Sequence, residues 1–321
     1  MLDILLVTFP FFALVLCGYI AARRRMLPLD AIPGLNTFVL YFALPCMLYR
    51  FGASTPIAQL LDGAAIAVYL LCALAMVAFV VWASRNSRIG WNDASFGALV
   101  AAFPNTGFMG VPLLVALLGA HAAGPAILTI LVDLLVTTSL CIALSRLDGA
   151  DQHGASKAAR NALKGVALNP MPWAIVLGGL SSAMQLEPIK PVAQTLGLLA
   201  DSASPVALFT IGAVLARSQY VAAAEEHAPM PWRDFVPVSL FKLLVHPLLV
   251  WGVGSLAIRL GLPLGHSGLT VMVLVAALPS ASSATLLAER FGADTGRIAR
   301  IILLTTAAAF LTFSAAVALL H

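Results

Sequence analysis

Ten apolar stretches, each close to the length of a membrane-spanning helix, are the feature that most constrains this chain. A helix needs about 20 apolar residues to cross the hydrocarbon core of a bilayer. The stretches lie at roughly 4–22, 35–51, 59–83, 95–118, 125–145, 171–186, 192–216, 235–259, 267–288 and 298–320. Only 10% of the 321 residues are charged, whereas a soluble domain averages about 25%. The sequence therefore predicts an all-α membrane protein with ten transmembrane helices, surrounded by lipid.

The basic residues fix the expected orientation. With the N-terminus outside, 14 of the 18 Lys and Arg residues fall in the cytoplasm, Lys242 falls in a span, and the remaining three lie outside. Cytoplasmic loops carry the excess of Lys and Arg in membrane proteins. We therefore expect a multi-pass protein of the cell (inner) membrane with both termini on the extracytoplasmic side. The basic residues have this topological role, so their excess does not indicate a nucleic-acid partner.

An internal repeat appears as matched residues at a constant offset. Residues 10, 18, 28, 45, 52 and 53 recur 160 positions later, as Pro170, Gly178, Pro188, Pro205, Gly212 and Ala213. We predict a first five-helix repeat at 1–146, a cytoplasmic connecting loop at 147–169, and a second repeat at 170–321. Since five spans are an odd number, the second repeat must be inverted, as in many secondary transporters.

A proline interrupts the fourth and the ninth stretch in the same context. AAFPN at 101–105 matches AALPS at 276–280. Pro104 and Pro279 cannot donate a helical hydrogen bond, and such breaks are tolerated in a membrane only where protein or a wet cavity surrounds them. The first amides after each break are free donors at the positive end of a helix dipole, which suits an anion. The released carbonyls could instead bind Na⁺, and the breaks could also be mere packing kinks.

The crossing of these two breaks is the predicted substrate site. The substrate-binding candidates are Pro104, Asn105, Thr106, Gly107, Pro279, Ser280, Ala281, Ser282 and Ser283.

Four ionisable residues inside the spans are candidates for a coupling proton or Na⁺, because charge is costly in hydrocarbon. They are Asp133, Asp201, Lys242 and His246. Each also has a structural interpretation. Lys242 could extend to the interface or pair with Asp133, His246 could be a packing residue, and Asp201 could be a cap. Lys242 and His246 are four residues apart and so share one helix face.

Five motifs resemble the auxin efflux carrier family in its bacterial branch, which includes malonate or malate permeases. They are FPNTGFMGVPLL, YFALPCMLYRFG, SPVALFTIGAVLA, FKLLVHPLL and LPSASSATLLAERFG. The resemblance implies a crossover fold in which the fourth and ninth helices cross at their prolines. It also implies elevator-type movement of small organic anions without ATP, often by a homodimer. Plant members place Asn after the ninth-helix proline, where this chain has Ser280.

We therefore expect a secondary transporter of small mono- or dicarboxylates, with no cofactor beyond a possible coupling ion. The alternative is a Na⁺- or proton-coupled cation antiporter or symporter on the same scaffold. An enzyme is not expected, because no paired GxGD aspartates, HExxH motif or Ser–His dyad is recognisable. The four cysteines lie in spans without CxxC spacing, so no metal site is expected.

Overall fold

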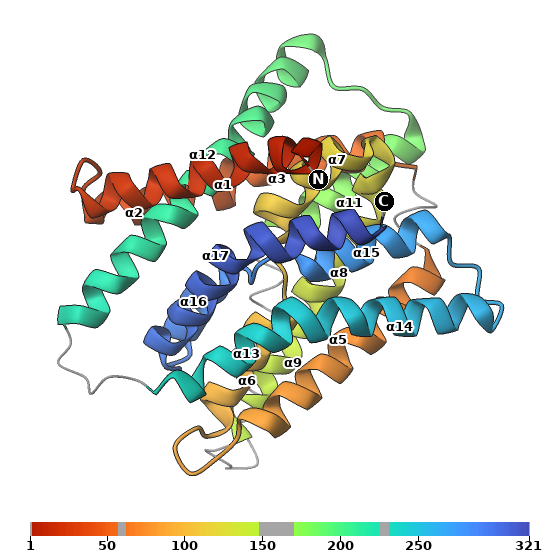
Figure 1. Cartoon of the computed structure of the whole chain (residues 1–321). Coiled ribbons are helices and arrows are strands. Elements are labelled where there is room, and N and C mark those ends of the chain that lie inside the picture. The colour runs from red at the N-terminus through yellow and green to blue at the C-terminus, as the bar shows by residue number, and fades with distance from the viewer. Residues whose placement is uncertain (1, 57–61, 148–169, 225–230, 321) are drawn as a thin grey trace. The chain divides into compact units, whose positions relative to one another are not determined.

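The computed structural model describes residues 2–56, 62–147, 170–224 and 231–320. Over these residues the chain is built of helices (Figure 1). Extended pairing within them is limited to one isolated antiparallel bridge, between Pro104 and Ser280. The predicted all-α class is therefore confirmed. The predicted connecting loop at 147–169 lies, beyond Leu147, outside the described residues.

Seven helical segments are long and apolar enough to cross a membrane, judged by length and composition. They are Leu6–Arg23, Leu29–Ser54, Gly63–Ser84, Ala120–Leu144, Lys190–Arg217, Val236–Arg259 and Thr295–Leu320. Each overlaps one of the predicted spans. The other three predicted spans correspond to shorter helices. The sixth is α11 (Pro170–Met184), the fourth is divided between α6 (Trp91–Ala102) and Thr106–Leu118, and the ninth between α15 (His266–Ala277) and α16 (Ala284–Arg290).

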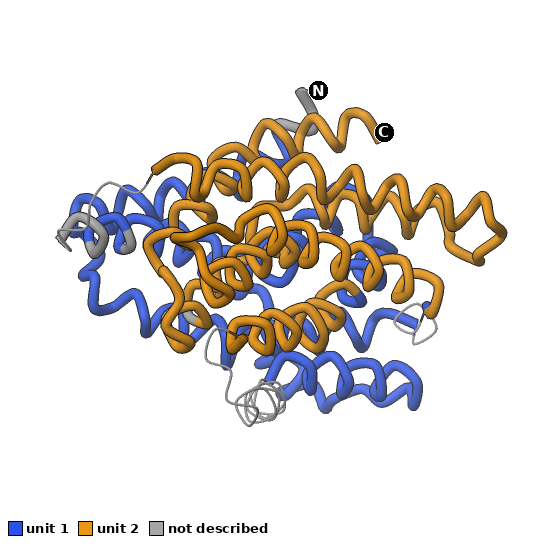
Figure 2. The backbone as a smooth tube through the Cα atoms, turned by 90° about the horizontal axis from the view of Figure 1, so that it is seen from below, with its two compact units in different colours: residues 1–62, 106–128, 169–226 blue, residues 63–105, 129–168, 227–321 orange. Residues whose placement is uncertain are grey.

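The chain forms two compact units, each assembled from separate stretches of sequence (Figure 2). Unit 1 contains residues 1–62, 106–128 and 169–226, and unit 2 contains the remainder. Each unit takes segments from both predicted sequence repeats. The spatial units therefore do not follow the two halves of the sequence, and the chain passes from unit 2 to unit 1 directly after Asn105.

Unit 1 is built on two helix pairs. α1 (Leu2–Arg23) packs along α12 (Lys190–Ala224), and α3 (Leu44–Ser54) packs along α11. The other elements of this unit include η1 (Leu29–Ala31), α2 (Ile32–Phe38), η2 (Val39–Ala43), η3 (Thr106–Gly110), α7 (Val111–Leu118) and η4 (Ala120–Ala122). Of these, α2 and η2 also pack on α12.

Glycines allow the close approach of the helices in both pairs. Gly18 of α1 lies against the backbone of α12, and Gly212 of α12 lies against the backbone of α1. In the other pair, Gly52 of α3 and Gly178 of α11 face each other. A side chain at Gly18, Gly178 or Gly212 would overlap backbone atoms of the facing helix. Small residues serve membrane helices in this way, because packing contacts rather than hydrophobic burial hold such helices together.

Unit 2 surrounds α6 and α15, the two helices that end at the breaks. α5 (Gly63–Ser84) packs on α6 and α14 (His246–Arg259), and α15 packs on α14 and α17 (Thr295–Leu320). The smaller elements are η5 (Asp133–Thr137), α9 (Thr138–Leu144), η7 (Trp232–Asp234), α13 (Val236–Leu240) and η8 (Phe241–Val245), and α8 (Ala123–Val132) begins in unit 1 and ends here. Both η5 and η8 are single π-helical turns.

Buried Arg297 ties together the elements at the end of unit 2 where α17 begins. Its Nε donates to the Asp234 carbonyl oxygen at 2.7 Å, and its Nη1 donates to the Asp93 carbonyl oxygen at 2.6 Å. The Arg297 amide donates to Asp294 Oδ1, and the Asp294 amide donates to Asp93 Oδ1, both at 2.8 Å. Arg297 thus joins α6, η7 and α17 through backbone groups, a role that its position in the sequence did not suggest.

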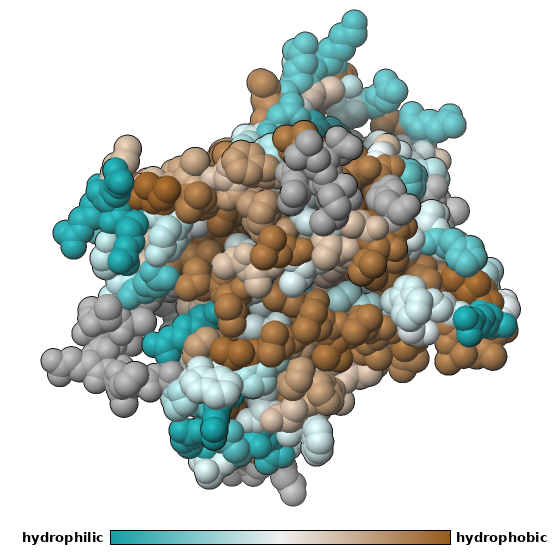
Figure 3. Space-filling model, in the orientation of Figure 1, coloured by the Kyte–Doolittle hydropathy of each residue, from teal (hydrophilic) through white to brown (hydrophobic). Residues whose placement is uncertain are grey.

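Large apolar side chains are exposed on both units. Phe9 and Leu16 lie on α1 in unit 1, whereas Trp82, Leu248 and Trp251 lie on α5 and α14 in unit 2. Figure 3 shows apolar side chains over much of the face in view, with hydrophilic side chains gathered toward its edges. Exposed apolar surface on this scale would be a liability in water. In a bilayer it contacts the lipid chains.

Candidate functional site

The two broken helices of unit 2 meet at their breaks. α6 ends at Ala102 and α15 ends at Ala277. The chain then runs extended in both, so that Pro104 and Ser280 form an antiparallel bridge. Beyond the bridge, the Asn105 amide donates to the Pro279 carbonyl oxygen at 2.8 Å, and the Ala281 amide donates to the Phe103 carbonyl oxygen at 3.0 Å.

This pairing explains how the breaks are accommodated in the membrane interior. Pro104 and Pro279 each remove one helical donor, and unpaired backbone groups cost several kcal/mol in hydrocarbon. Each break supplies a donor and an acceptor to the other. Both segments are buried, with Asn105 4% and Ser280 1% exposed. The pairing therefore satisfies two amides and two carbonyls of the breaks within the protein.

Unused polar groups remain beside the pairing. The Ser280 amide donates to Thr305 Oγ1 of α17 at 3.3 Å, but the buried Ser280 Oγ has no hydrogen-bond partner. Ala281 is also buried, and its amide is already used by the pairing. The half-buried Ser282 and Ser283 follow, and no amide hydrogen bond from either is found to a described residue. These groups have hydrogen-bonding capacity that the pairing does not use.

Thr106 and Gly107, the next two predicted binding residues, begin unit 1. They open the π turn η3, in which Thr106 is fully buried with an unpartnered Oγ1. A methyl group on Gly107 would meet Leu44 at 3.7 Å, an ordinary van der Waals contact. Seven of the nine predicted binding residues therefore belong to unit 2, and Thr106 and Gly107 belong to unit 1.

Asp133 is fully buried within unit 2 and is held by two hydroxyl groups. Tyr69 of α5 donates to its Oδ2 at 2.9 Å, and Thr137 donates to its Oδ1 at 3.0 Å. Among the described residues, no direct ion pair joins Asp133 to Lys242. The two charges interact over a longer distance. The sequence did not identify Tyr69, because a tyrosine in an apolar span has no local signal of a partner 64 positions away.

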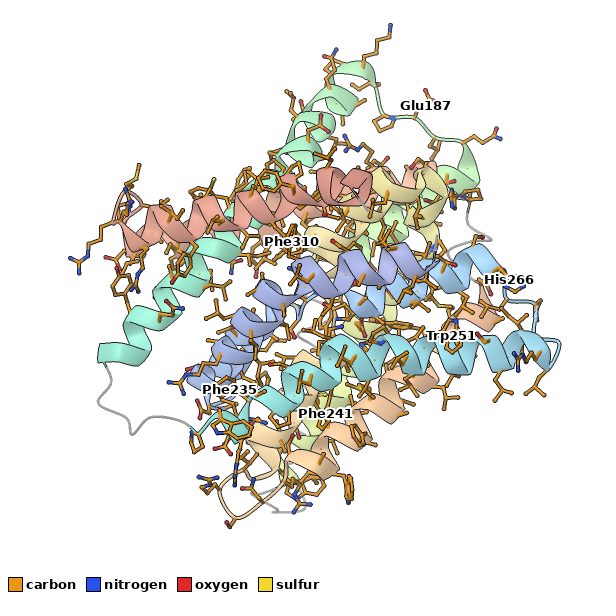
Figure 4. The ribbon with its side chains drawn as sticks, in the orientation of Figure 1. Glu187, Phe235, Phe241, Trp251, His266 and Phe310 are labelled. Carbon is orange, nitrogen blue, oxygen red and sulfur yellow. The ribbon has the colours of Figure 1, made fainter. Side chains whose placement is uncertain are left out.

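Lys242 is fully buried and does not extend to the interface. Its Nζ lies 3.2 Å from His246 Nδ1 and donates to the Ala276 carbonyl oxygen at 2.6 Å. The predicted shared face of Lys242 and His246 is therefore confirmed. His246 Nε2 is buried and without a partner. Both residues belong to the run from η8 into α14, on which Figure 4 labels Phe241 and Trp251.

Asp201 belongs to a different environment. It lies on α12 in unit 1 and accepts a hydrogen bond from Arg50 Nη1 of α3 at 2.6 Å. Both side chains of this ion pair are exposed. Asp201 is therefore an exposed residue of unit 1, whereas Asp133, Lys242 and His246 are buried residues of unit 2.

Comparison with known proteins identifies the family. The chain matches the family described as Membrane transport protein (Mem_trans) over residues 4–317. A Rhizobium meliloti (strain 1021) protein named "Putative malonate transporter" is 28% identical over 302 residues, covering 92% of this chain and 89% of that protein. The Escherichia coli (strain K12) "Uncharacterized transporter YfdV" is 26% identical, covering 89% of this chain and 88% of that protein.

A plant relative matches over a shorter region. "Auxin efflux carrier component 7" of Arabidopsis thaliana is 26% identical over 151 residues, which cover 46% of this chain and 24% of that protein. Together with the seven apolar helices, the family match identifies a multi-pass membrane protein. The chain therefore belongs to the Membrane transport protein family, which its motifs predicted as the auxin efflux carrier family, and it is a transporter rather than an enzyme.

Proposed function

We propose that this protein is a secondary carrier of small organic anions and that it holds a substrate carboxylate at the paired breaks. The observation that carries the proposal is the antiparallel pairing of Pro104 with Ser280, which leaves polar groups without partners inside the membrane. A buried hydroxyl without a partner costs about 1–3 kcal/mol. A ligand that accepts its hydrogen bond recovers that cost.

A carboxylate fits the groups present. The Ser280 hydroxyl and the amides of Ser282 and Ser283 are donors, and Asn105, whose backbone pairs with Pro279, carries an amide side chain. Hydrogen bonds from such donors to an ionised acceptor are shorter and about twice as strong as neutral ones. Asn105 and Ser280 occupy matched positions of the two breaks but differ in chemistry, so we propose that Asn105 is the more selective of the two.

We further propose two inverted five-helix repeats and elevator-type movement. Gly18 and Gly178, like Gly52 and Gly212, are separated by the 160 positions of the sequence repeat. Each is a contact glycine, so the α1–α12 pair and the α11–α3 pair use matched residues. This correspondence supports the inverted repeat. The gathering of both breaks in unit 2 supports this unit as the body that carries the substrate across the membrane.

Uptake by purified, reconstituted protein tests the function. The name of the Rhizobium meliloti relative makes malonate the first probe, followed by malate, succinate and acetate. We expect Asn105→Ala to reduce uptake at least tenfold and Ser280→Ala to reduce it severalfold, with melting temperatures close to wild type. Ser95→Ala is the matched control, because Ser95 is also buried, unpartnered and in unit 2. Unchanged uptake by Asn105→Ala would remove the carboxylate site from the breaks.

A cation carrier on the same scaffold is the second candidate. The full burial of Asp133 favours it, since a buried carboxylate is a typical cation ligand. Against it, the Asp133 oxygens already accept hydrogen bonds from Tyr69 and Thr137. Measuring sodium-driven proton flux in liposomes without any carboxylic acid distinguishes the two candidates. We expect no such flux from an organic-anion carrier.

A further inference from the structure

Lys242 compensates for the broken backbone of α15. In an intact helix the Ala276 carbonyl would accept from the amide of Ser280, but that amide donates to Thr305 instead. The Lys242 ammonium donates to this carbonyl at 2.6 Å. A cation at a helix C-terminus also complements the negative end of the dipole. The charge on Lys242 is thereby linked directly to the ninth-helix break.

His246 makes the Lys242 charge sensitive to a single proton. Their nitrogens lie 3.2 Å apart and both are fully buried. Two positive charges at that distance would repel strongly in a low-dielectric interior. The two bases therefore share one excess proton and titrate as a pair. When that proton leaves, the bond to the Ala276 carbonyl changes from charge-assisted to neutral and weakens.

Asp133 provides the counter-charge, and Tyr69 connects it to the pair. Tyr69 donates to Asp133, and its ring lies 6.3 Å, between centroids, from the His246 ring. The buried Cys72 on α5 and Cys141 on α9 interact electrostatically with Tyr69 and with Asp133 respectively. We call Tyr69, Asp133, Lys242 and His246 the buried polar cluster. It is neutral when Asp133 is ionised and the pair holds its proton.

The other elements around the cluster bring few competing charges within the described residues. α13 carries no ionisable residue, and the histidine of α15, His266, is exposed. At the end of unit 2, the Arg297 guanidinium of α17 donates to the Asp93 carbonyl oxygen of α6, and the Asp93 carboxylate accepts from the Asp294 amide. Arg300 of α17 is half-buried. The charge of the cluster is thus set mainly by Asp133, Lys242 and His246.

We propose that the buried polar cluster is a proton-binding site through which proton binding is coupled to anion binding at the breaks. This inference rests on the proposed carrier function and deepens it. The proton enters from water on one side, resides on the Lys242–His246 pair, and leaves to water on the other. The bound proton offsets the charge of the substrate. It also strengthens the hydrogen bond from Lys242 to the Ala276 carbonyl oxygen, and so affects the α15 break. The four side chains are fully buried, so exchange with water requires a conformational change.

Proteoliposomes loaded with a pH-sensitive dye test the coupling, with radiolabelled malonate as the probe. We expect wild-type malonate entry to acidify the interior, and an inward proton gradient to raise accumulation at least tenfold. His246→Asn preserves a polar group near Nδ1 but cannot carry the proton. It should reduce the gradient effect to less than twofold, while malonate–malonate exchange stays within threefold of wild type. Asp133→Asn should behave alike.

His266→Asn is the matched control, since His266 stands at the opposite end of α15 from the break (Figure 4). It should retain the full gradient response. The inference is overturned if wild-type malonate enters without acidification, or if His246→Asn and Asp133→Asn keep the tenfold gradient response. The inference is also overturned if either variant, at a wild-type melting temperature, loses malonate–malonate exchange together with the gradient response. That result would show that the cluster is part of the anion site.

A second measurement tests proton coupling on wild-type protein, in case the variants have lowered melting temperatures. Calorimetry of malonate binding to wild-type protein, in buffers of different ionisation enthalpy, reports the protons taken up on binding. We expect uptake of up to one proton, and zero uptake would overturn the inference. Absence of exchange of malonate, malate, succinate and acetate by wild type would instead refute the carrier function itself. The two failures are therefore distinguishable.

Discussion

The amide of Ser280 depends on one hydroxyl group, that of Thr305. Thr305→Val keeps the side-chain shape but leaves this buried amide without an acceptor, which costs about 1–3 kcal/mol. We expect a lower melting temperature in detergent and slower anion uptake. Thr312→Val is the control, because the Thr312 hydroxyl, on the same helix, bonds only the Ala308 carbonyl of its own helix. Equal melting temperatures for the two variants would show that Thr305 does not support the break.

Gly97 is constrained by the guanidinium that closes unit 2. A methyl group there would lie 2.7 Å from Arg297 Nη1, and Arg297 is held by the carbonyls of Asp93 and Asp234. We expect Gly97→Ala to destabilise the protein by about 1–3 kcal/mol, as overpacking does. Gly268→Ala has open space around it and should be nearly neutral. Thermal unfolding of the two variants side by side provides the comparison.

At the level of single residues, the sequence predicted where helical hydrogen bonds are lost, but not which groups replace them. Pro104 and Pro279 indicate a missing donor in their own helices, because proline has no N–H. The groups that satisfy the freed backbone, such as Thr305 and Lys242, come from other helices. The position of such a partner depends on helix packing. A single sequence carries no record of it.

The elements of unit 1 give a prediction about the crossing of α1 and α12. Gly18→Ala and Gly212→Ala each place a methyl group into the facing backbone, so each should lower the melting temperature substantially. Both glycines serve the same crossing, so the double variant should cost less than the sum of the single effects. Gly197→Ala, on α12 with nothing near it, is the control. Strict additivity would indicate two independent contacts.

Helix positions were predicted better than helix geometry. Runs of apolar residues located the long spans because length and composition suffice for that purpose. The π turns η5 and η8, which carry Asp133 and Lys242, were not predicted. Neither contains a proline or glycine that would mark a local irregularity. π turns frequently occur at functional sites, and here the polar contacts of Asp133 and Lys242 accompany them.

At the scale of the whole molecule, the short α11 decides the topology of the second half. The positive-inside pattern predicts ten spans, with the short α11 counted as a full crossing. If α11 did not cross, every later loop would change sides. Arg88 follows the third predicted span and Arg259 follows the eighth, so the two lie on opposite faces only if α11 crosses.

Single-cysteine labelling in intact cells tests this topology. After replacement of Cys17, Cys46, Cys72 and Cys141 by alanine, cysteine is introduced either at Arg88 or at Arg259. A membrane-impermeant thiol reagent added outside should label Arg259→Cys and leave Arg88→Cys unlabelled until the cells are broken. Equal protection of both positions would mean that α11 does not span the membrane. The two halves would then share one orientation after the connecting loop, and the antiparallel pairing at Pro104 and Ser280 could not be explained by an inverted repeat.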